Sequence, residues 1–269
     1  MGAIIKNEAK QRAISYLKDH LDTTSRRELA RRLGIGKTTV NRWATELGHH
    51  PKKYAVNENF FDEWSEKSAY ILGFIFADGN VAWNTKKSYW TLTITASEKD
   101  KAHLEKIREL MKSTKPLRYS KKTKSYRLTA TNRPLCKKLM RLGVIPRKSL
   151  KVKFPHIPKH YLKAFIRGVV DGDGNVRYVE RDRSPYFEIT IASGSEKFCK
   201  GLRNAIKENF GIPANIRRVK GHNTLIIQYS CNRGKKLAET IYAGATIFLG
   251  RKYAAYEQCK TKERINYGE

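Results

Sequence analysis

An internal repeat constrains the fold of this chain more than any other feature of its sequence. Residues 70–81, with the sequence YILGFIFADGNV, recur 95 residues later as residues 165–176, with the sequence FIRGVVDGDGNV. Both copies continue through the same series: an alternating strand pattern near 89–95 and 186–191, a Ser-Glu-Lys triplet, a helix near 99–112 and 196–210, a strand near 124–131 and 223–231, and a basic helix. The repeat predicts two equivalent halves that pair about a pseudo-twofold axis.

We therefore predict an α+β fold in which each half runs helix, strand pair, helix, strand pair, helix, or αββαββα. The first repeat is assigned to residues 65–150 and the second to residues 161–269. Residues 151–160 contain two prolines and are predicted to connect the halves. Residues 51–64 are predicted to be a linker to the segment that precedes them.

The first 50 residues favour a small all-α domain of three short helices, near 7–21, 25–33 and 37–47. The turn Leu-Gly-Ile-Gly at 33–36 gives the last two helices the spacing of a helix-turn-helix. Its third helix would then reach phosphates or base edges in a major groove through Lys37, Thr38, Thr39, Asn41 and Arg42. The alternative is an ordinary three-helix cap without DNA contact.

Charge indicates the class of partner. The 55 Lys and Arg residues outnumber the 25 Asp and Glu residues, which leaves a net charge of +30. Double-stranded DNA is the expected partner, because neutralised phosphates release condensed counterions. A membrane is not expected, since no apolar run approaches about 18 residues. With no secretory signal at its start and four cysteines that form no C-x-x-C pair, the chain is expected to be cytoplasmic or organellar and not secreted.

Small residues are spaced four apart in both repeated segments: Gly73 and Ala77 in the first, Gly168 and Gly172 in the second. Four-residue spacing places each pair on one face of a helix. We predict that the two helices pack through these faces with their backbones nearly in contact, so that their C-terminal ends converge.

An aspartate, Asp78 or Asp173, stands at the end of each of these helices. The negative end of a helix disfavours a carboxylate, and two carboxylates that face each other also repel. A bound cation would relieve both effects, and oxygen ligands favour a hard ion such as Mg²⁺, with Mn²⁺ or Ca²⁺ as alternatives. This pattern predicts a metal site for phosphodiester hydrolysis.

The segments ILGFIFADG and IRGVVDGDG resemble two copies of the signature of the LAGLIDADG homing endonucleases, and the likeness covers residues from about 65 to 260. The resemblance implies a monomeric, pseudo-symmetric saddle whose antiparallel sheets lie in the major groove of a long DNA target. It implies metal binding by Asp78 and Asp173 together with the preceding Ala77 and Gly172.

The resemblance also implies a basic catalytic residue near the start of each half's last helix, which here indicates Lys148 and Lys252. Simple contact with the DNA backbone is the alternative role for these lysines. Two positions depart from the signature: Phe76 replaces an acidic residue, and Arg167 replaces a small one. Asp171 should point away from the metal by about 200° and be structural or solvent-facing.

Base reading on the saddle is predicted to come from polar positions of the strands, assigned by alternation. These positions are Trp90, Thr91, Thr93, Thr95, Arg127, Thr129, Glu188, Thr190 and Gln228.

The function expected from these features is metal-dependent cleavage of both strands of a long duplex site. Two alternatives use the same scaffold: a DNA-binding regulator that does not cleave, and a group I intron maturase whose partner is intron RNA. Pure regulators are expected to lose the metal carboxylates, whereas this chain retains both.

Overall fold

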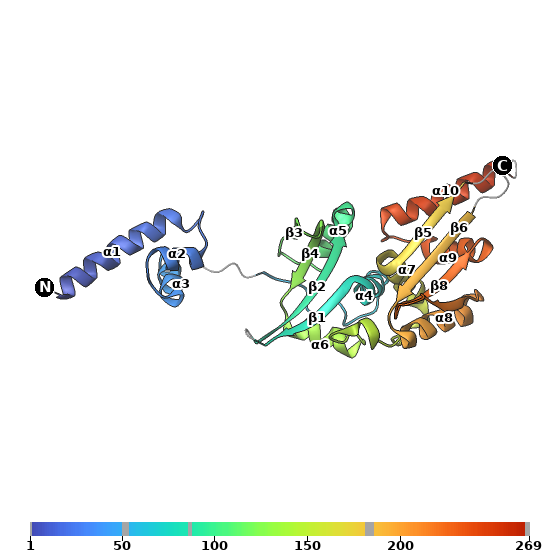
Figure 1. Cartoon of the computed structure of the whole chain (residues 1–269), viewed down its shortest axis with the longest axis horizontal. Coiled ribbons are helices and arrows are strands. Elements are labelled where there is room, and N and C mark those ends of the chain that lie inside the picture. The colour runs from blue at the N-terminus through green and yellow to red at the C-terminus, as the bar shows by residue number, and fades with distance from the viewer. Residues whose placement is uncertain (1, 50–53, 86–87, 181–185, 267–269) are drawn as a thin grey trace. The chain divides into compact units, whose positions relative to one another are not determined.

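The computed structural model of the protein describes residues 2–49, 54–85, 88–180 and 186–266. The chain forms two compact units, Met1–Lys53 and Tyr54–Glu269, which are coloured from blue to red along the chain in Figure 1. None of the described helices is long and apolar enough to cross a membrane.

The smaller unit consists of the helices α1 (Gly2–His20), α2 (Arg26–Arg32) and α3 (Lys37–Glu46). The Ser25 side chain caps α2 by accepting a hydrogen bond from the Glu28 amide at 3.3 Å. Gly34 turns the chain between α2 and α3 at φ +64°, a conformation that favours glycine. The unit has its own core, which contains Leu17, Leu29, Ala30, Val40 and Trp43.

The larger unit contains two repeats of the predicted αββαββα order, so the predicted α+β architecture is confirmed. The first repeat comprises α4 (Glu66–Asp78), β1 (Gly79–Asn84), β2 (Tyr89–Ser97), η1 (Glu98–Asp100), α5 (Lys101–Leu110), β3 (Arg118–Ser120), β4 (Ser125–Ala130) and α6 (Arg133–Arg141). The second repeat comprises α7 (Leu162–Asp173), β5 (Gly174–Val179), β6 (Tyr186–Ser193), α8 (Glu196–Phe210), β7 (Asn215–Arg218), β8 (Leu225–Ser230) and α9 (Asn232–Tyr242).

Each repeat folds into one antiparallel sheet, in the order β1-β2-β4-β3 and β5-β6-β8-β7. Helices α4 and α7 lie side by side between the two sheets (Figure 1). The first repeat is followed by two short 3-10 turns, η2 (Lys148–Leu150) and η3 (Lys159–Tyr161), and the second by a further helix, α10 (Gly250–Asn266). Lys148 therefore lies in a 3-10 turn and not near the start of an α-helix, whereas Lys252 does lie in the first turn of α10.

The segment 54–64 belongs to the larger unit and is not a free linker as predicted; residues 51–53 lie outside the described residues. Backbone hydrogen bonds of 2.9 Å from the Asn57 amide to Met111 and 3.0 Å from the Thr114 amide to Ala55 hold this segment. Phe61 is buried in the core. These contacts join elements distant in sequence, which the local pattern did not indicate.

Alternation along β2 separates a core face from an exposed face. Leu92 and Ile94 are buried, while Thr91, Thr93 and Thr95, which alternate with them, are partly exposed. Trp90 has the parity of Leu92, pairs with Trp83 across the hairpin and packs against the core. The assignment of Trp90 to the DNA-reading face is therefore wrong.

Candidate functional site

The interface between α4 and α7 brings the two helix backbones into contact. A Cβ atom added to Gly73 would lie 2.1 Å from the carbonyl oxygen of Phe165, and one added to Gly168 would lie 2.0 Å from that of Tyr70. No real side chain fits at these distances. Toward the C-terminal ends, a Cβ on Gly172 would meet the Ala77 Cβ at 2.3 Å. The helices therefore run together as far as their last turns.

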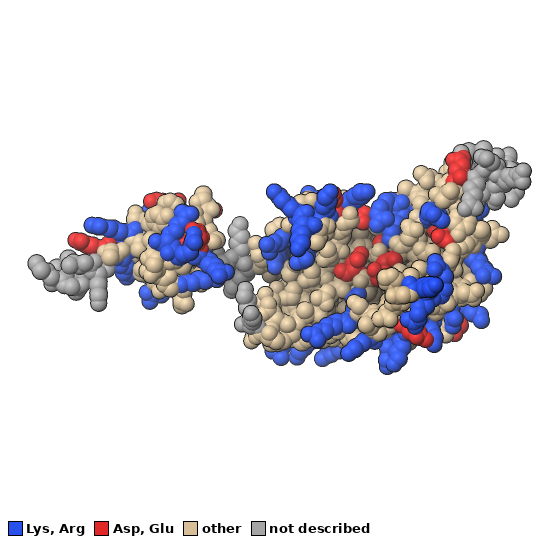
Figure 2. Space-filling view, in the orientation of Figure 1, with Lys and Arg blue, Asp and Glu red and all other residues tan. Residues whose placement is uncertain are grey.

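Asp78 and Asp173 end these helices, and the two carboxylates are close enough to repel each other. A Cβ built on Gly172 would be only 3.4 Å from Asp78 Oδ2. Both aspartates are exposed as whole residues, yet protein atoms surround their carboxylates closely. Figure 2 shows acidic side chains gathered in the middle of the larger unit, between regions rich in Lys and Arg.

The electrostatics of the pair disfavour ionisation without a cation. Burial, followed by repulsion from Asp173, raises the pKa of Asp78 to about 6. Burial also raises the pKa of Asp173. The positive charges of Lys148 and Lys252 act on both carboxylates in the opposite direction.

Lys148 and Lys252 are buried beside these helix ends, with 9% and 2% of their surfaces exposed. The Lys148 ammonium donates hydrogen bonds to the carbonyl oxygens of Phe76 and, at 2.7 Å, of Ala77. Burial lowers its pKa from the ordinary value. Lys148 thus binds carbonyls of the last turn of α4, which have no partner within the helix.

Lys252 makes the equivalent contacts to α7, and more of them. Its ammonium donates to the carbonyl oxygens of Val170 and Asp171 at 2.7 Å each, to that of Gly172 at 3.3 Å, and to that of Gly174. Burial lowers the pKa of Lys252 to about 8. Each lysine therefore places a cation at the negative end of a helix that ends in an aspartate.

The donor chemistry fits a hard divalent cation, because two carboxylates converge where Lys148 and Lys252 compensate the negative charge only in part. Among the described residues, no group of three or more His, Cys, Asp or Glu side chains is placed to hold a metal ion. Further ligands would therefore be water or phosphate oxygens. Ala77 and Gly172 were also predicted to bind the metal. Their carbonyl oxygens accept hydrogen bonds from Lys148 and Lys252, respectively.

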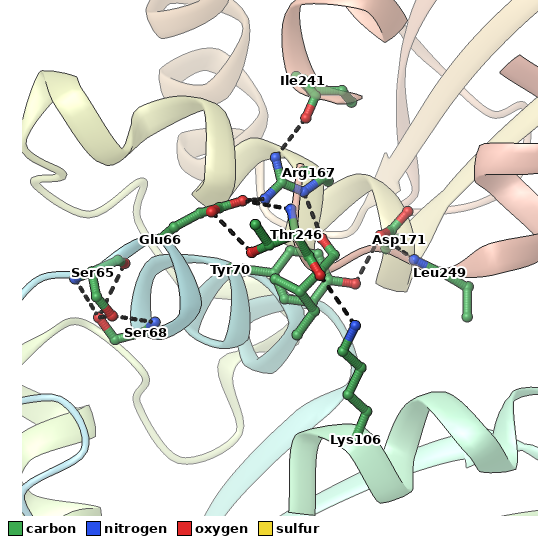
Figure 3. A network of polar contacts seen from close by, with 11 residues as sticks. Ser65, Glu66, Ser68, Tyr70, Lys106, Arg167, Asp171, Ile241, Thr246 and Leu249 are labelled. Atoms are coloured by element: carbon green, nitrogen blue, oxygen red, sulfur yellow. Dashed lines mark hydrogen bonds and ion pairs between the residues drawn. The ribbon is translucent and has the colours of Figure 1, made fainter. Parts of the chain in front are cut away.

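Asp171 is a buried structural carboxylate, with 1% of its surface exposed. It accepts hydrogen bonds from the hydroxyl groups of Tyr70 at 2.7 Å and Tyr242 at 2.8 Å, and from the Leu249 amide at 2.8 Å. Figure 3 shows this carboxylate between Tyr70 of α4 and Leu249, which precedes α10. Of the two roles expected for Asp171, the structural one is found.

Arg167 forms a second polar connection, which the sequence did not reveal. Its guanidinium is buried, donates to the carbonyl oxygens of Ile247 at 2.8 Å and Ile241 at 2.6 Å, and forms an ion pair with Glu66. Glu66 also accepts a hydrogen bond of 3.0 Å from the Thr246 hydroxyl (Figure 3). Arg167 thus ties the start of α4 to the last turn of α9 and to the chain that follows it. The only sequence signal was an arginine within an apolar helix.

The remaining positions predicted to read DNA alternate with the buried core residues and so lie on the faces of the two sheets opposite the core. They are Thr91, Thr93, Thr95, Arg127 and Thr129 in the first sheet, and Glu188, Thr190 and Gln228 in the second. They differ in accessibility. Glu188 is buried at 7% exposure, and the Thr91 hydroxyl is buried without a hydrogen-bond partner within the described parts of the chain. Sequence reasoning missed the arginines that share these faces, which are Arg118, Arg177 and Arg217.

The smaller unit presents α3 to solvent. Lys37, Thr38 and Arg42 are exposed, while Thr39 and Asn41 are half-buried. The guanidinium of Arg26 donates a hydrogen bond of 3.3 Å to the Asn41 side-chain oxygen.

No curated protein sequence matches this chain, but residues 160–242 match the family described as LAGLIDADG-like domain. The chain is similar in structure to the LAGLIDADG meganuclease I-AabMI bound to uncleaved DNA, with a TM-score of 0.54, 14% identity, and coverage of 76% of this chain and 92% of that one. It is also similar to I-DmoI in complex with DNA and Ca, with a TM-score of 0.52, 18% identity, and coverage of 72% and 97%. Residues 160–242 therefore match a LAGLIDADG-like domain, and the chain shares its fold with these two solved structures.

Proposed function

We propose that this protein is a homing endonuclease that hydrolyses both strands of a long duplex DNA site with divalent metal held by Asp78 and Asp173. The observation that carries the proposal is the convergence of these two aspartates at the ends of helices packed through glycine. A net charge of +30 suits a polyanionic substrate. The solved structures I-AabMI and I-DmoI, which share the fold, are bound to DNA, and the latter is also in complex with Ca.

Asp78 and Asp173 would hold the cation, with Mg²⁺ as the expected ion and Mn²⁺ or Ca²⁺ as substitutes. Bound there, it would polarise the scissile phosphate and lower the pKa of the attacking water. We assign Lys148 and Lys252 to positioning, because their ammonium groups bind backbone carbonyls of the helix ends. They would keep the two aspartates fixed and offset part of the local negative charge.

The exposed faces of the two sheets would lie in the major groove. Polar side chains reach base edges there, and the arginines on the same faces would bind phosphates or guanine. The smaller unit would bind flanking DNA through α3, where Lys37, Thr38 and Arg42 are exposed. This second contact would lengthen the recognised site.

Cleavage of a randomised duplex library in Mg²⁺ tests the proposal. The wild type should cut one long site on both strands, and sequencing of the cut ends identifies it. Asp78→Asn and Asp173→Asn should each lose at least about a hundredfold in cleavage rate, since each removes a metal ligand. Both should still bind the site in EDTA. Tight binding of duplex DNA or intron RNA without any cleavage by the wild type would instead support the regulator or the maturase.

A further inference from the structure

A cluster of linked polar side chains stands on the exposed-face side of the second sheet. Glu188 is its centre: its Oε2 accepts hydrogen bonds from the Tyr186 hydroxyl at 2.6 Å and from the Gln228 side-chain amide. The hydroxyl of Ser230 lies 3.4 Å from the same oxygen, and Arg177 lies 3.8 Å from Oε1. We call these five residues the Glu188 cluster.

The first sheet has no equivalent. At the positions that the register makes equivalent to Arg177, Tyr186, Glu188 and Gln228 lie Ala82, Tyr89, Thr91 and Thr129. Within the described parts of this sheet, no side-chain hydrogen bond or ion pair joins these four residues. The linked polar network is therefore particular to the second sheet, where the side chains of the Glu188 cluster hold one another in place.

The cluster fixes which way the Gln228 amide points. An ionised carboxylate has only acceptor oxygens, so the Gln228 atom that faces Glu188 must be the NH₂ group. The same nitrogen also donates to the Ser230 hydroxyl at 3.2 Å. Both N–H donors are thus engaged, and the carbonyl oxygen Oε1 is the part of the amide left for a ligand.

Gln228 and Ser230 also line a groove of about 530 Å³ that is open to solvent. Its other walls are polar and basic: Asn215, Arg217, Cys231, Asn232 and Arg233. A groove of this composition suits a nucleotide, since the arginines can meet phosphate while the amide meets a base edge.

We propose that Gln228 determines base specificity in the second half of the target and that Glu188 is its positioning residue, an inference that rests on the proposed function. In the major groove, only the amino groups of adenine and cytosine donate hydrogen bonds. An amide that presents its oxygen therefore selects an amino base over a keto base. One position of the second half-site is restricted in this way, by about tenfold for one such hydrogen bond.

The test is selection of a randomised duplex by the full chain in Ca²⁺, followed by sequencing of the bound DNA. The wild type should prefer adenine or cytosine at one position of the second half-site by about tenfold. Gln228→Ala should abolish that preference with other positions unchanged. Glu188→Gln should weaken it, because a glutamine can accept as well as donate and lets the Gln228 amide turn over.

Gln228→Lys distinguishes a loss of specificity from misfolding. A lysine carries only donors and should reverse the preference toward keto bases, which a misfolded protein would not show. Thr129→Ala in the first sheet is the matched control, because Thr129 is the counterpart of Gln228, and it should leave the base preference at this position of the second half-site unchanged. If the wild type selects no duplex, the proposed function fails and this inference fails with it. If a long site is selected and Gln228→Ala keeps the same base preference, the inference alone is overturned.

Discussion

The two halves differ where they touch, at positions that the repeat makes equivalent. In the first half, Phe76 packs its ring against Phe165 at 5.4 Å between centroids. In the second half, Asp171 occupies the place of Phe76, and Tyr70 occupies that of Phe165; these two form a hydrogen bond of 2.7 Å. The same pair of positions is therefore apolar on one side of the pseudo-twofold axis and polar on the other.

This difference shows that symmetry is kept by the backbone and not by the side chains. Gly73 and Gly168 make nearly identical close approaches on the two helices, at 2.1 and 2.0 Å for an added Cβ. The contacts around them need only fill space or pair polar groups. Close backbone packing thus fixes how the two helices lie against each other, and the side chains around the contact can differ between the halves.

Alanine at the helix contacts should have the largest effect. Gly73→Ala and Gly168→Ala would each force a Cβ into a backbone carbonyl, so each should lower the free energy of unfolding by about 3 kcal/mol or more. Urea unfolding measures this. Gly250→Ala is the control, because no atom lies within 4 Å of its added Cβ, and it should change stability by under about 0.5 kcal/mol. A difference of several kcal/mol between the two helix variants would refute the backbone symmetry.

The polar and apolar pairs should respond unequally to replacement. Asp171→Asn replaces an acceptor of three hydrogen bonds and leaves buried donors unmatched, so it should cost about 2 kcal/mol. Phe76→Leu keeps the apolar character and should cost about 1 kcal/mol. The same urea titration compares them. Equal losses of unfolding free energy would mean that the hydrogen bonds of Asp171 add no stability beyond that of a side chain filling the same space.

The smallest effect concerns the aspartates themselves. In EDTA, the pKa of Asp78 is raised to about 6 from an ordinary 3.8, so the folded protein holds this proton more tightly than the unfolded chain does. Stability from this group therefore falls as pH rises from about 4 to about 6. Asp78→Asn has no such proton to lose, and its Tm should exceed that of the wild type by about 2 °C at pH 7.5 and match it near pH 4.

Thermal melts at both pH values check this expectation. Asp173→Asn should shift Tm in the same direction, because burial raises that pKa too. Ca²⁺ should stabilise the wild type more than either variant. A Tm for Asp78→Asn at or below that of the wild type at pH 7.5 would show that the pair is not strained.

The sequence predicted what depends on local periodicity and on repetition. The two copies of the motif were enough to predict paired helices and converging aspartates, since small residues four apart share a helix face. Trp90 and Thr91 were both assigned to the DNA-reading face, but they are neighbours in β2, and successive side chains of a strand point to opposite faces. Leu92 and Ile94 are buried, so Trp90 lies on the core face with them and Thr91 lies on the other face.

Contacts between distant segments could not be read from the chain. Lys148 reaches carbonyls 71 and 72 residues earlier, and Arg167 binds carbonyls 74 and 80 residues later. Their partners are backbone carbonyls, which every residue type has, so the sequence does not indicate which residues they belong to. The catalytic role predicted for Lys148 and Lys252 was based on their positions in the sequence. Their hydrogen bonds to the helix ends depend on the tertiary fold and could not be predicted in this way.

The bond from Arg167 to Glu66 also bears on how two separate chains would assemble. Fragments produced by a cut within residues 151–160 would carry complementary groups, with Glu66 and Tyr70 on one and Arg167 and Asp171 on the other. Two copies of the second fragment would instead set Asp171 against Phe165, which has no hydroxyl group to donate. The chain thus behaves as two different subunits joined by a linker, and its buried polar pairs disfavour self-association of the second half.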